Sequence, residues 1–298
     1  MSYPIILVPG IARFDFLRSR FIQRINILLS DRALTADRTH YFRRIRPYLQ
    51  ENGFDVEHAD NGFADEIGTR ADRLAATVML TTEKYKAEKV HIIGHSMGGL
   101  DARYMVVEIP QISEKVATIT SIGTPHLGTP FADFFMDLGT DAALDFINTH
   151  LCLDFRGFLA ITSEVTREFN ERAAPAEAAN GVQYFTYSAY QGQEKMFEPL
   201  KFIWQYIDER EGDNDGLVSV SSQAWGTEIV GADGITKPIH QRQFDIGADH
   251  LNEVGWWDIN EWQSTYFWQF GILKQRRTYE QHIRDIYLKI AEETASIL

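Results

Sequence analysis

The sequence predicts an α/β protein with a mostly parallel central sheet and helices on both faces of that sheet. Two observations lead to this fold class. Short apolar runs alternate with helical stretches along the first 122 residues of the 298-residue chain. The apolar runs are also nearly continuous, without regular polar alternation, which is typical of strands buried on both faces.

The expected strands in the first part of the chain lie at residues 3–8, 54–59, 89–93 and 116–122. The expected helices lie between them, at residues 39–51, 65–86 and 100–109. The longest of these helices is amphipathic, with an apolar side formed by Ile67, Leu74, Val78 and Met79. Strands and helices that alternate at this spacing indicate βαβ units.

The pattern changes after residue 129. Residues 131–172 predict two or more helices with no strand between them, and further strands are expected at 182–188, 217–220 and 239–246. The tail, residues 279–298, predicts a packing helix because Ile283, Ile286, Ile290 and Ala291 recur at helical spacing. No repeat or linker-like segment divides the sequence. We therefore expect one domain over residues 1–298, with a helical insertion.

Composition excludes several classes of protein. The chain carries 29 Lys and Arg against 42 Asp and Glu, a formal net charge of −13. Binding to nucleic acid needs a basic face, so we expect no nucleic-acid partner. The same charge disfavours docking on anionic lipid, but it does not exclude an uncharged lipid as a substrate. With 44% hydrophobic residues, the chain is too apolar for a disordered protein.

Cysteine content and the N-terminal sequence bear on the cellular compartment. A single cysteine, Cys152, cannot form an internal disulfide, and we expect it to be buried. The N-terminus has neither a basic segment nor a small-residue cleavage site, and no apolar run approaches the roughly 18 residues of a membrane span. We therefore expect a cytoplasmic protein, with secretion by a signal-independent route as the alternative.

One motif carries the chemistry. The segment Gly94-His-Ser-Met-Gly98 has the pattern G-x-S-x-G and lies directly between an expected strand and an expected helix. This context is the one required for a nucleophile elbow, in which a serine stands on a sharp, strained turn. Side chains two positions to either side would crowd the turn, so glycine is needed at both. Ser96 is therefore the expected nucleophile, and a capping serine at an ordinary strand-to-helix turn is the alternative.

A serine nucleophile needs a general base and a carboxylate that orients the base. In this arrangement the chain order is serine, acid, histidine. The histidines that follow the serine are His126, His150, His240 and His250. We favour His250 because it lies in a loop after an expected strand. The acid candidates are Glu209, Glu211, Asp213, Asp215, Asp233 and Asp249. Asp213 and Asp215 share one turn, and the local sequence does not separate them.

Five motifs, in order, resemble those of the bacterial true lipases of the α/β-hydrolase fold, the group that includes enzymes of Pseudomonas, Burkholderia and Proteus. The motifs are Pro4-Ile-Ile-Leu-Val-Pro-Gly-Ile11, Gly94-His-Ser-Met-Gly-Gly99, Gly123-Thr-Pro-His-Leu-Gly-Thr129, Asn214-Asp-Gly-Leu-Val218 and Asp249-His-Leu-Asn252. They cover residues 3–255 of the chain. The resemblance therefore implies an α/β-hydrolase fold with a helical lid insertion.

The resemblance also implies roles for particular residues. It implies a catalytic triad of Ser96, Asp215 and His250, and an oxyanion hole formed by the backbone N–H groups of Ile11 and Met97. It further implies that residues 130–170 form a lid over an apolar acyl pocket. Apolar residues expected in that lid are Phe131, Phe134, Phe135, Leu138, Phe146, Leu151 and Phe155, with plain core packing as the alternative.

Three features depart from the family pattern. Pro9 stands where the family has a histidine before the glycine of the first motif. Asn252 stands where the family's calcium loop has an aspartate, and no matching aspartate precedes Asp215. Calcium prefers carboxylate oxygens, so we expect no cofactor, with calcium as the alternative that the resemblance implies. Residues 18–38 are longer than the corresponding loop, which predicts an added cap or partner surface.

These observations predict a serine hydrolase that cleaves carboxylic esters with hydrophobic acyl chains, a triacylglycerol lipase or an esterase, through an acyl-enzyme. The expected partners are a lipid or small ester substrate and, through the lid, a transient lipid–water interface. We expect no obligate protein partner. A phospholipase or acyltransferase on the same triad is the alternative, followed by a non-catalytic binding protein. The acidic balance favours an uncharged ester as substrate.

Overall fold

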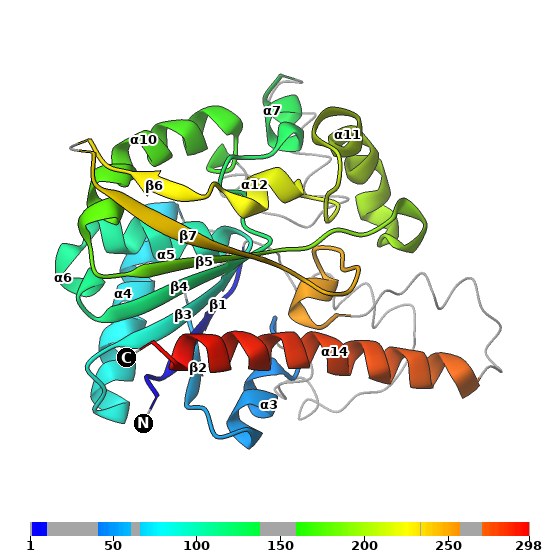
Figure 1. Ribbon diagram of the computed structural model, residues 1–298. Helices are drawn as coiled ribbons and strands as arrows, with labels where there is room; N and C mark the ends of the chain where they lie inside the picture. Colours follow the sequence, from blue (N-terminus) through cyan, green and yellow to red (C-terminus); the bar gives the residue numbers. More distant parts are fainter. Residues whose placement is uncertain are drawn as a thin grey trace.

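The computed structural model describes residues 2–10, 41–60, 66–137, 159–232, 234–256 and 270–297. Its strands form a seven-stranded sheet in the order β2-β1-β3-β4-β5-β7-β6 (Figure 1). The strands are β1 (Ile5–Val8), β2 (Val56–His58), β3 (Val90–His95), β4 (Val116–Ile122), β5 (Gln183–Ser188), β6 (Glu228–Val230) and β7 (Thr236–Gln243). Neighbouring strands pair in parallel, except that β6 and β7 are antiparallel. The sheet is therefore mostly parallel, as the sequence predicts.

Helices cover both faces of the sheet, which explains the continuous apolar runs in its strands (Figure 1). Ile6 and Val8 of β1 point into a core on one face, while Ile5 and Leu7 belong to the core on the other face. The first face carries α4 (Ile67–Tyr85), α5 (Met97–Glu108) and α10 (Ser163–Ala179). The second face carries α3 (Ile45–Glu51) and the long α14 (Phe270–Ala295).

The remaining helices are short. They are α6 (Pro110–Ser113), α7 (Pro130–Asp137), α11 (Lys201–Glu211) and α12 (Val220–Ala224), with the 3-10 turns η3 (Gln193–Lys195), η4 (Glu198–Leu200) and η5 (Asn252–Val254). Helices α7 and α11 build a third apolar cluster, in which Phe131 and Phe135 meet Ile203 and Ile207. No helix in the described ranges is both long enough and apolar enough to cross a membrane.

Most expected elements are confirmed, with shifted ends; two expectations are wrong, and one strand was missed. Residues 217–220 form no strand, because the turn at Asp215 leads directly into α12. Strand β6 was not expected, since it has only three residues and two of them are exposed. Met79 is 45% exposed and does not belong to the apolar side of α4, whereas Leu74 and Val78 are fully buried.

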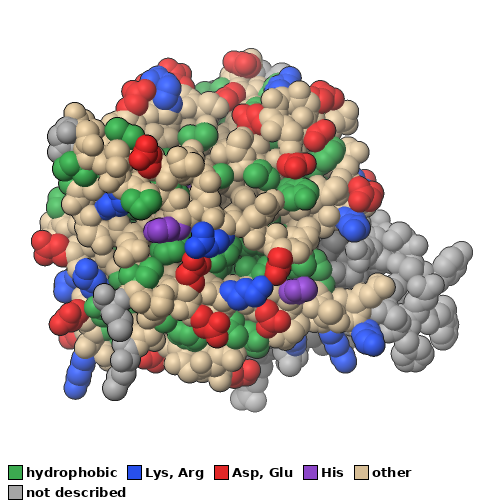
Figure 2. All heavy atoms as spheres, viewed as in Figure 1, with side chains coloured by type: hydrophobic (Ala, Val, Ile, Leu, Met, Phe, Trp, Pro, Cys, Tyr) green, Lys and Arg blue, Asp and Glu red, His purple; other side chains and the backbone are tan. Residues whose placement is uncertain are grey.

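Charged side chains of both signs share the molecular surface. On the face drawn in Figure 2, carboxylates are interspersed with lysines and arginines and do not gather in one patch. Several of these charges pair locally, for example Lys289 with Asp245 at 2.9 Å and Arg242 with Glu293 at 2.6 Å. The net charge of −13 is thus not concentrated at one place on this face.

Candidate active site

The order in which the chain adds strands reverses at β1, and the loops that follow the neighbouring strands β1 and β3 come together there. From β1 the chain passes to β2 on one side, and it returns to β3 on the other side of β1. In open parallel sheets, ligands bind at such a switch point, outside the carboxyl ends of the strands. Pro9 and Gly10 follow β1, and Ser96 follows β3. The expected nucleophile therefore lies where the topology favours a binding site.

Ser96 occupies a backbone conformation that residues with a side chain rarely adopt. Its φ is 56° and its ψ is −131°, between the end of β3 and the first residue of α5. Such a conformation costs on the order of 1–3 kcal/mol and persists only where neighbours enforce it. The N–H of Ser96 donates to the Ile122 carbonyl at 2.8 Å, and its own carbonyl accepts from the Thr124 hydroxyl at 2.8 Å. The turn is thus held by β4 and the loop that follows it.

Glycines make this turn possible, as the motif predicts. A Cβ on Gly94 would lie 2.7 Å from the carbonyl carbon of Gly98, and a Cβ on Gly98 would collide with the Val8 carbonyl oxygen. Gly10 is equally confined, because a Cβ there would lie 2.8 Å from the Cβ of Ser96. The loop after β1 therefore approaches the serine as closely as backbone atoms allow.

His250 and Asp215 form a buried hydrogen-bonded pair. The distance from His250 Nδ1 to Asp215 Oδ2 is 2.7 Å, and the two side chains are 6% and 0% exposed. The other carboxylate oxygen, Oδ1, accepts the backbone N–H groups of Leu217 at 2.8 Å and Val218 at 2.7 Å. The His250 N–H also donates to the Asp215 carbonyl at 2.9 Å. Both the aspartate rotamer and the position of the histidine are consequently fixed.

His250 lies close to the end of β3, where the elbow begins. His95, the residue before Ser96, packs its ring against the ring of His250 with 4.5 Å between the ring centroids. The His250–Asp215 pair thus lies at the end of the sheet that carries Ser96, and the three residues follow one another along the chain in the order of a hydrolase triad.

A buried ion pair braces the loop that follows β1. Arg70 of α4 forms a two-pronged contact with Asp101 of α5, with Nε and Nη2 at 2.5–3.0 Å from the carboxylate. A further Arg70 N–H donates to the Pro9 carbonyl at 3.1 Å. Both side chains are fully buried. Because Asp101 lies on the helix that Ser96 introduces, the pair fixes the loop relative to the elbow.

A second carboxylate, Glu253, lies beside the histidine pair. Its Oε2 is 2.8 Å from His95 Nε2 and 3.7 Å from His250 Nδ1. Burial, followed by the negative charges of Asp215 and Asp249, raises the pKa of Glu253 well above its usual range. Burial lowers the pKa of His95 well below its usual range, with a smaller effect from His250. Glu253 was not among the site residues predicted from the sequence, because its contact with His95 arises only in the folded chain.

Apolar side chains lie next to the first turn of α5. Met97 and Leu100 are 1% exposed and share the cluster of Phe131, Phe135 and Ile203.

The two described ends of the helical insertion are joined by hydrogen bonds, because Asp133 accepts the Ser163 N–H at 2.8 Å and the Ser163 hydroxyl at 2.5 Å.

Comparison with known proteins finds sequence similarity to lipases. A family model described as a PGAP1-like alpha/beta domain matches residues 73–140, which include the elbow. A triacylglycerol lipase of Pseudarthrobacter phenanthrenivorans is 37% identical over 139 residues, which cover 46% of this chain and 37% of that lipase. A triacylglycerol lipase of Vibrio cholerae is 26% identical over 285 residues, covering 85% of this chain and 79% of the lipase. The chain is thus similar in sequence to bacterial lipases.

A solved structure agrees on the fold. The metagenomic carboxyl esterase MGS0156 superposes with a TM-score of 0.64 at 16% identity, covering all of this chain and 76% of that one. Together with the mostly parallel sheet, this likeness shows an α/β-hydrolase fold. The match to the Pseudarthrobacter lipase nevertheless spans only about a third of that protein's length.

The loop in which the resemblance to bacterial lipases places calcium is closed by its own hydrogen bonds. The Asn252 amide oxygen accepts the Asp249 N–H at 3.1 Å, and its amide nitrogen donates to the Trp256 carbonyl at 2.7 Å. Asp249 accepts backbone N–H groups of Leu251 and Asn252 on one oxygen and of Phe197 on the other. These side chains stabilise the loop as it stands and do not fit a calcium site.

The other candidate residues lie elsewhere or outside the described chain. Asp213 is exposed, and His126 is buried away from the solvent between Arg103 at 3.1 Å and Ser121 at 2.7 Å. His240 stacks on Phe185 within the sheet. The predictions that fall outside the described residues concern Ile11, residues 18–38, Leu138, Phe146, His150, Leu151, Cys152, Phe155 and Asp233.

Proposed function

We propose that the protein hydrolyses carboxylic esters through a triad of Ser96, Asp215 and His250. The observation that carries the proposal is the buried His250–Asp215 hydrogen bond of 2.7 Å at the sheet edge where Ser96 stands on a positive-φ turn. Lipases among the sequence relatives support the same reaction class. A structural serine would have no need of a strained turn or of a buried base–acid pair beside it.

The proposed reaction follows from the hydrogen bonds of His250. Its Nδ1–H donates to Asp215, so the neutral ring presents Nε2 as the free base. Nε2 removes the proton of the Ser96 hydroxyl as Oγ attacks the ester carbonyl, and it returns that proton to the departing alcohol. Water then attacks the acyl-enzyme by the same proton transfers in the opposite order. Asp215 stabilises the imidazolium that forms between these steps.

The oxyanion needs backbone donors, and we assign them to the N–H groups of Met97 and Ile11. Met97 is the first residue of α5, whose N-terminus carries a partial positive charge and free N–H groups. Ile11 follows Gly10 in the sequence, and Arg70 donates a hydrogen bond to the carbonyl of Pro9 just before it. A developing negative charge on the carbonyl oxygen is stabilised most by donors that are already in place.

Apolar substrate preference follows from the surroundings of α5. The first turn of α5 packs into an apolar cluster that includes Met97, Leu100, Phe131 and Phe135, so the elbow has apolar surroundings on this side. Each methylene buried there would contribute about 0.8 kcal/mol, so longer acyl chains gain affinity for as long as the added carbons are buried. We therefore propose hydrophobic esters, including triacylglycerols, as the substrate class.

Contact with a lipid–water interface belongs to the same proposal. Four large apolar side chains are exposed in or just before the helices α7, α10 and α11: Leu127 (45%), Met136 (47%), Val165 (43%) and Phe202 (55%). Helix α7 contacts both α10 and α11, so these residues belong to one group of neighbouring helices. Exposed apolar residues on neighbouring helices are candidates for contact with an apolar partner.

A chain-length series of p-nitrophenyl esters tests the reaction, with Ser96→Ala as the inactive reference. We expect wild-type hydrolysis that rises with acyl length and a loss to background in the variant. Emulsified triacylglycerol then tests the interface, with Phe202→Ser compared with Leu80→Ser, which removes a 66% exposed leucine from α4. Equal activity of wild type and Ser96→Ala would refute the proposed function, and equal emulsion activity of the two surface variants would refute the interface.

A further inference from the structure

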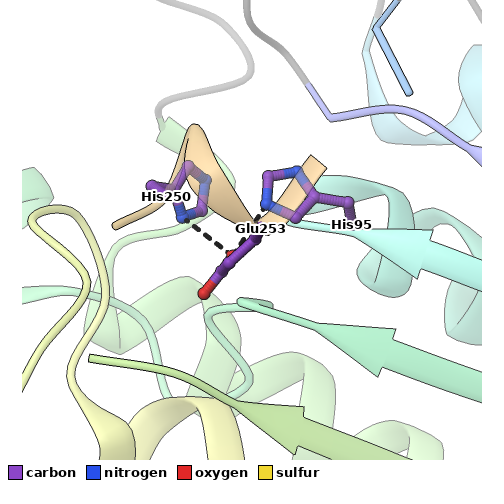
Figure 3. A group of neighbouring side chains, drawn as sticks. All are labelled: His95, His250 and Glu253. Atoms are coloured by element: carbon purple, nitrogen blue, oxygen red, sulfur yellow. Dashed lines mark hydrogen bonds and ion pairs between the residues drawn. The ribbon is translucent and has the colours of Figure 1, made fainter. Parts of the chain in front are cut away.

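Three metal-ligating side chains converge behind the proposed catalytic base. His95, His250 and Glu253 each offer one ligand atom, and these three atoms all lie within 4.8 Å of one another. Figure 3 shows the two imidazoles facing the Glu253 carboxylate, His95 from the end of β3 and the other two from the segment around η5. All three side chains are at most 6% exposed. A buried His₂Glu group of this kind has a recognised coordination chemistry.

Two imidazole nitrogens and one carboxylate oxygen are a donor set that Zn²⁺ uses in proteins. Zinc–ligand bonds of about 2.0–2.2 Å put the ligands of a tetrahedral ion about 3.4 Å apart. The distances between the ligand atoms lie on either side of that value. They are 2.8 Å from Glu253 Oε2 to His95 Nε2 and 3.7 Å from Glu253 Oε2 to His250 Nδ1. Asp215 Oδ2, 2.7 Å from the same nitrogen of His250, can supply a fourth ligand. Mg²⁺ and Ca²⁺ prefer all-oxygen sites, so they do not match this set.

The surroundings support coordination by these residues. The remaining ring nitrogen of His95, Nδ1, lies 2.6 Å from the Tyr41 hydroxyl, the kind of outer partner that orients a metal-binding histidine. Glu253 Oε1 is buried and accepts no hydrogen bond from the described residues. A buried carboxylate oxygen with unused lone pairs is available to a cation. Gly123 leaves the space that the Glu253 carboxylate fills, since a Cβ there would collide with Oε2.

We propose that His95, His250 and Glu253 form an inhibitory site for Zn²⁺. Part of this proposal rests on the proposed function, because inhibition requires His250 to be the catalytic base. Coordination uses Nδ1 of His250, which otherwise donates to Asp215. The ring proton then resides on Nε2, and a protonated Nε2 cannot accept the Ser96 proton. In the zinc-bound protein Ser96 is therefore unchanged, but His250 cannot act as its base.

Metal binding can be tested without any substrate. After removal of metal by a chelator, Zn²⁺ binding is measured by titration calorimetry, and Co²⁺ is added to report tetrahedral coordination through its visible absorption. We expect one Zn²⁺ per chain and a weakening of at least about tenfold to 100-fold in His95→Gln and in Glu253→Gln, since even outer-sphere changes have effects of that size. His282→Gln, which removes an exposed histidine of α14, serves as the matched control and should bind like wild type.

Ester hydrolysis then tests the consequence of binding. Zn²⁺ should inhibit wild type and His282→Gln over the concentration range in which it binds, while the residual activity of His95→Gln should resist it. Thermal unfolding of each variant verifies that it is folded, and Glu253→Gln repeats the test should His95→Gln fail to fold. Absence of stoichiometric Zn²⁺ binding to wild type, or unchanged affinity in both site variants, overturns the site. Binding in a protein that hydrolyses no ester supports the metal site and contradicts the proposed function.

Discussion

Replacing Asp215 by asparagine should abolish catalysis by changing the tautomer of His250. The hydrogen bonds of Asp215 decide which of its two oxygen positions the oxygen and the nitrogen of the asparagine amide take. The asparagine oxygen keeps the position of Oδ1, because the N–H groups of Leu217 and Val218 both require an acceptor there. The amide NH₂ then points at His250 Nδ1, 2.7 Å away, and that nitrogen must accept a hydrogen bond. The ring proton moves to Nε2, which can no longer act as a base.

The expected loss in kcat is about 10⁴-fold, the size of effect that the same change has in a serine protease triad. At about 1.36 kcal/mol for each factor of ten, this corresponds to about 5 kcal/mol of lost transition-state stabilisation. The assay is steady-state hydrolysis of a p-nitrophenyl ester, with KM and thermal stability measured in parallel. Asp213→Asn, at the exposed neighbouring aspartate, should retain wild-type kcat. Activity of Asp215→Asn within tenfold of wild type would refute the assigned role of the aspartate.

Three further outcomes are expected. Arg70→Met leaves Asp101 buried without its ion-pair partner, so urea unfolding should show a free energy of unfolding lower by about 3–5 kcal/mol. A decrease below about 1 kcal/mol would contradict a stabilising role for the Arg70–Asp101 ion pair. Burial lowers the pKa of His91 from 6.5 to about 4, so between these pH values the unfolded state binds more protons than the folded state. The free energy of unfolding should therefore fall as the pH falls from about 6.5 to 4, by up to about 3 kcal/mol. His91→Gln should flatten this decline in a pH series of urea unfolding curves, and an identical pH slope in the variant would contradict it. The rate of ester hydrolysis should be unchanged by a calcium-selective chelator, because Asn252 and Asp249 already form hydrogen bonds within their loop. Loss of activity on chelation that added calcium restores would contradict this expectation.

Much of the fold could be predicted because its strands are buried on both faces and its helices are periodic. The elbow was predictable for a sharper reason, since Gly94 and Gly98 stand where any Cβ would strike backbone. The turn after Asp215 was misjudged as a strand because its apolar residues, Leu217 and Val218, look like strand residues while their N–H groups bond the aspartate. The sequence alone left Asp213 and Asp215 as alternatives, since only tertiary structure decides which carboxylate faces a histidine 35 residues away.

Glu253 shows the limit of reading a site from motifs. Its contacts are with His95, from a strand 158 residues earlier, and with His250 in its own turn. No local periodicity signals such a convergence, because it depends on the register of β3 and on the position of η5 above the sheet. Burial and the nearby charges of Asp215 and Asp249, which raise its pKa, likewise depend on the folded arrangement.

The central claim is that Ser96 is a nucleophile activated by His250. Incubation with a fluorophosphonate, followed by digestion and peptide mass spectrometry, tests it most directly, because the reagent bonds covalently only to an activated serine. The account predicts one adduct per chain, on the peptide that contains Ser96, no adduct in Ser96→Ala and strongly slowed labelling in His250→Gln. Absence of an adduct on folded wild-type protein, or an adduct on another residue with Ser96 unmodified, would contradict it.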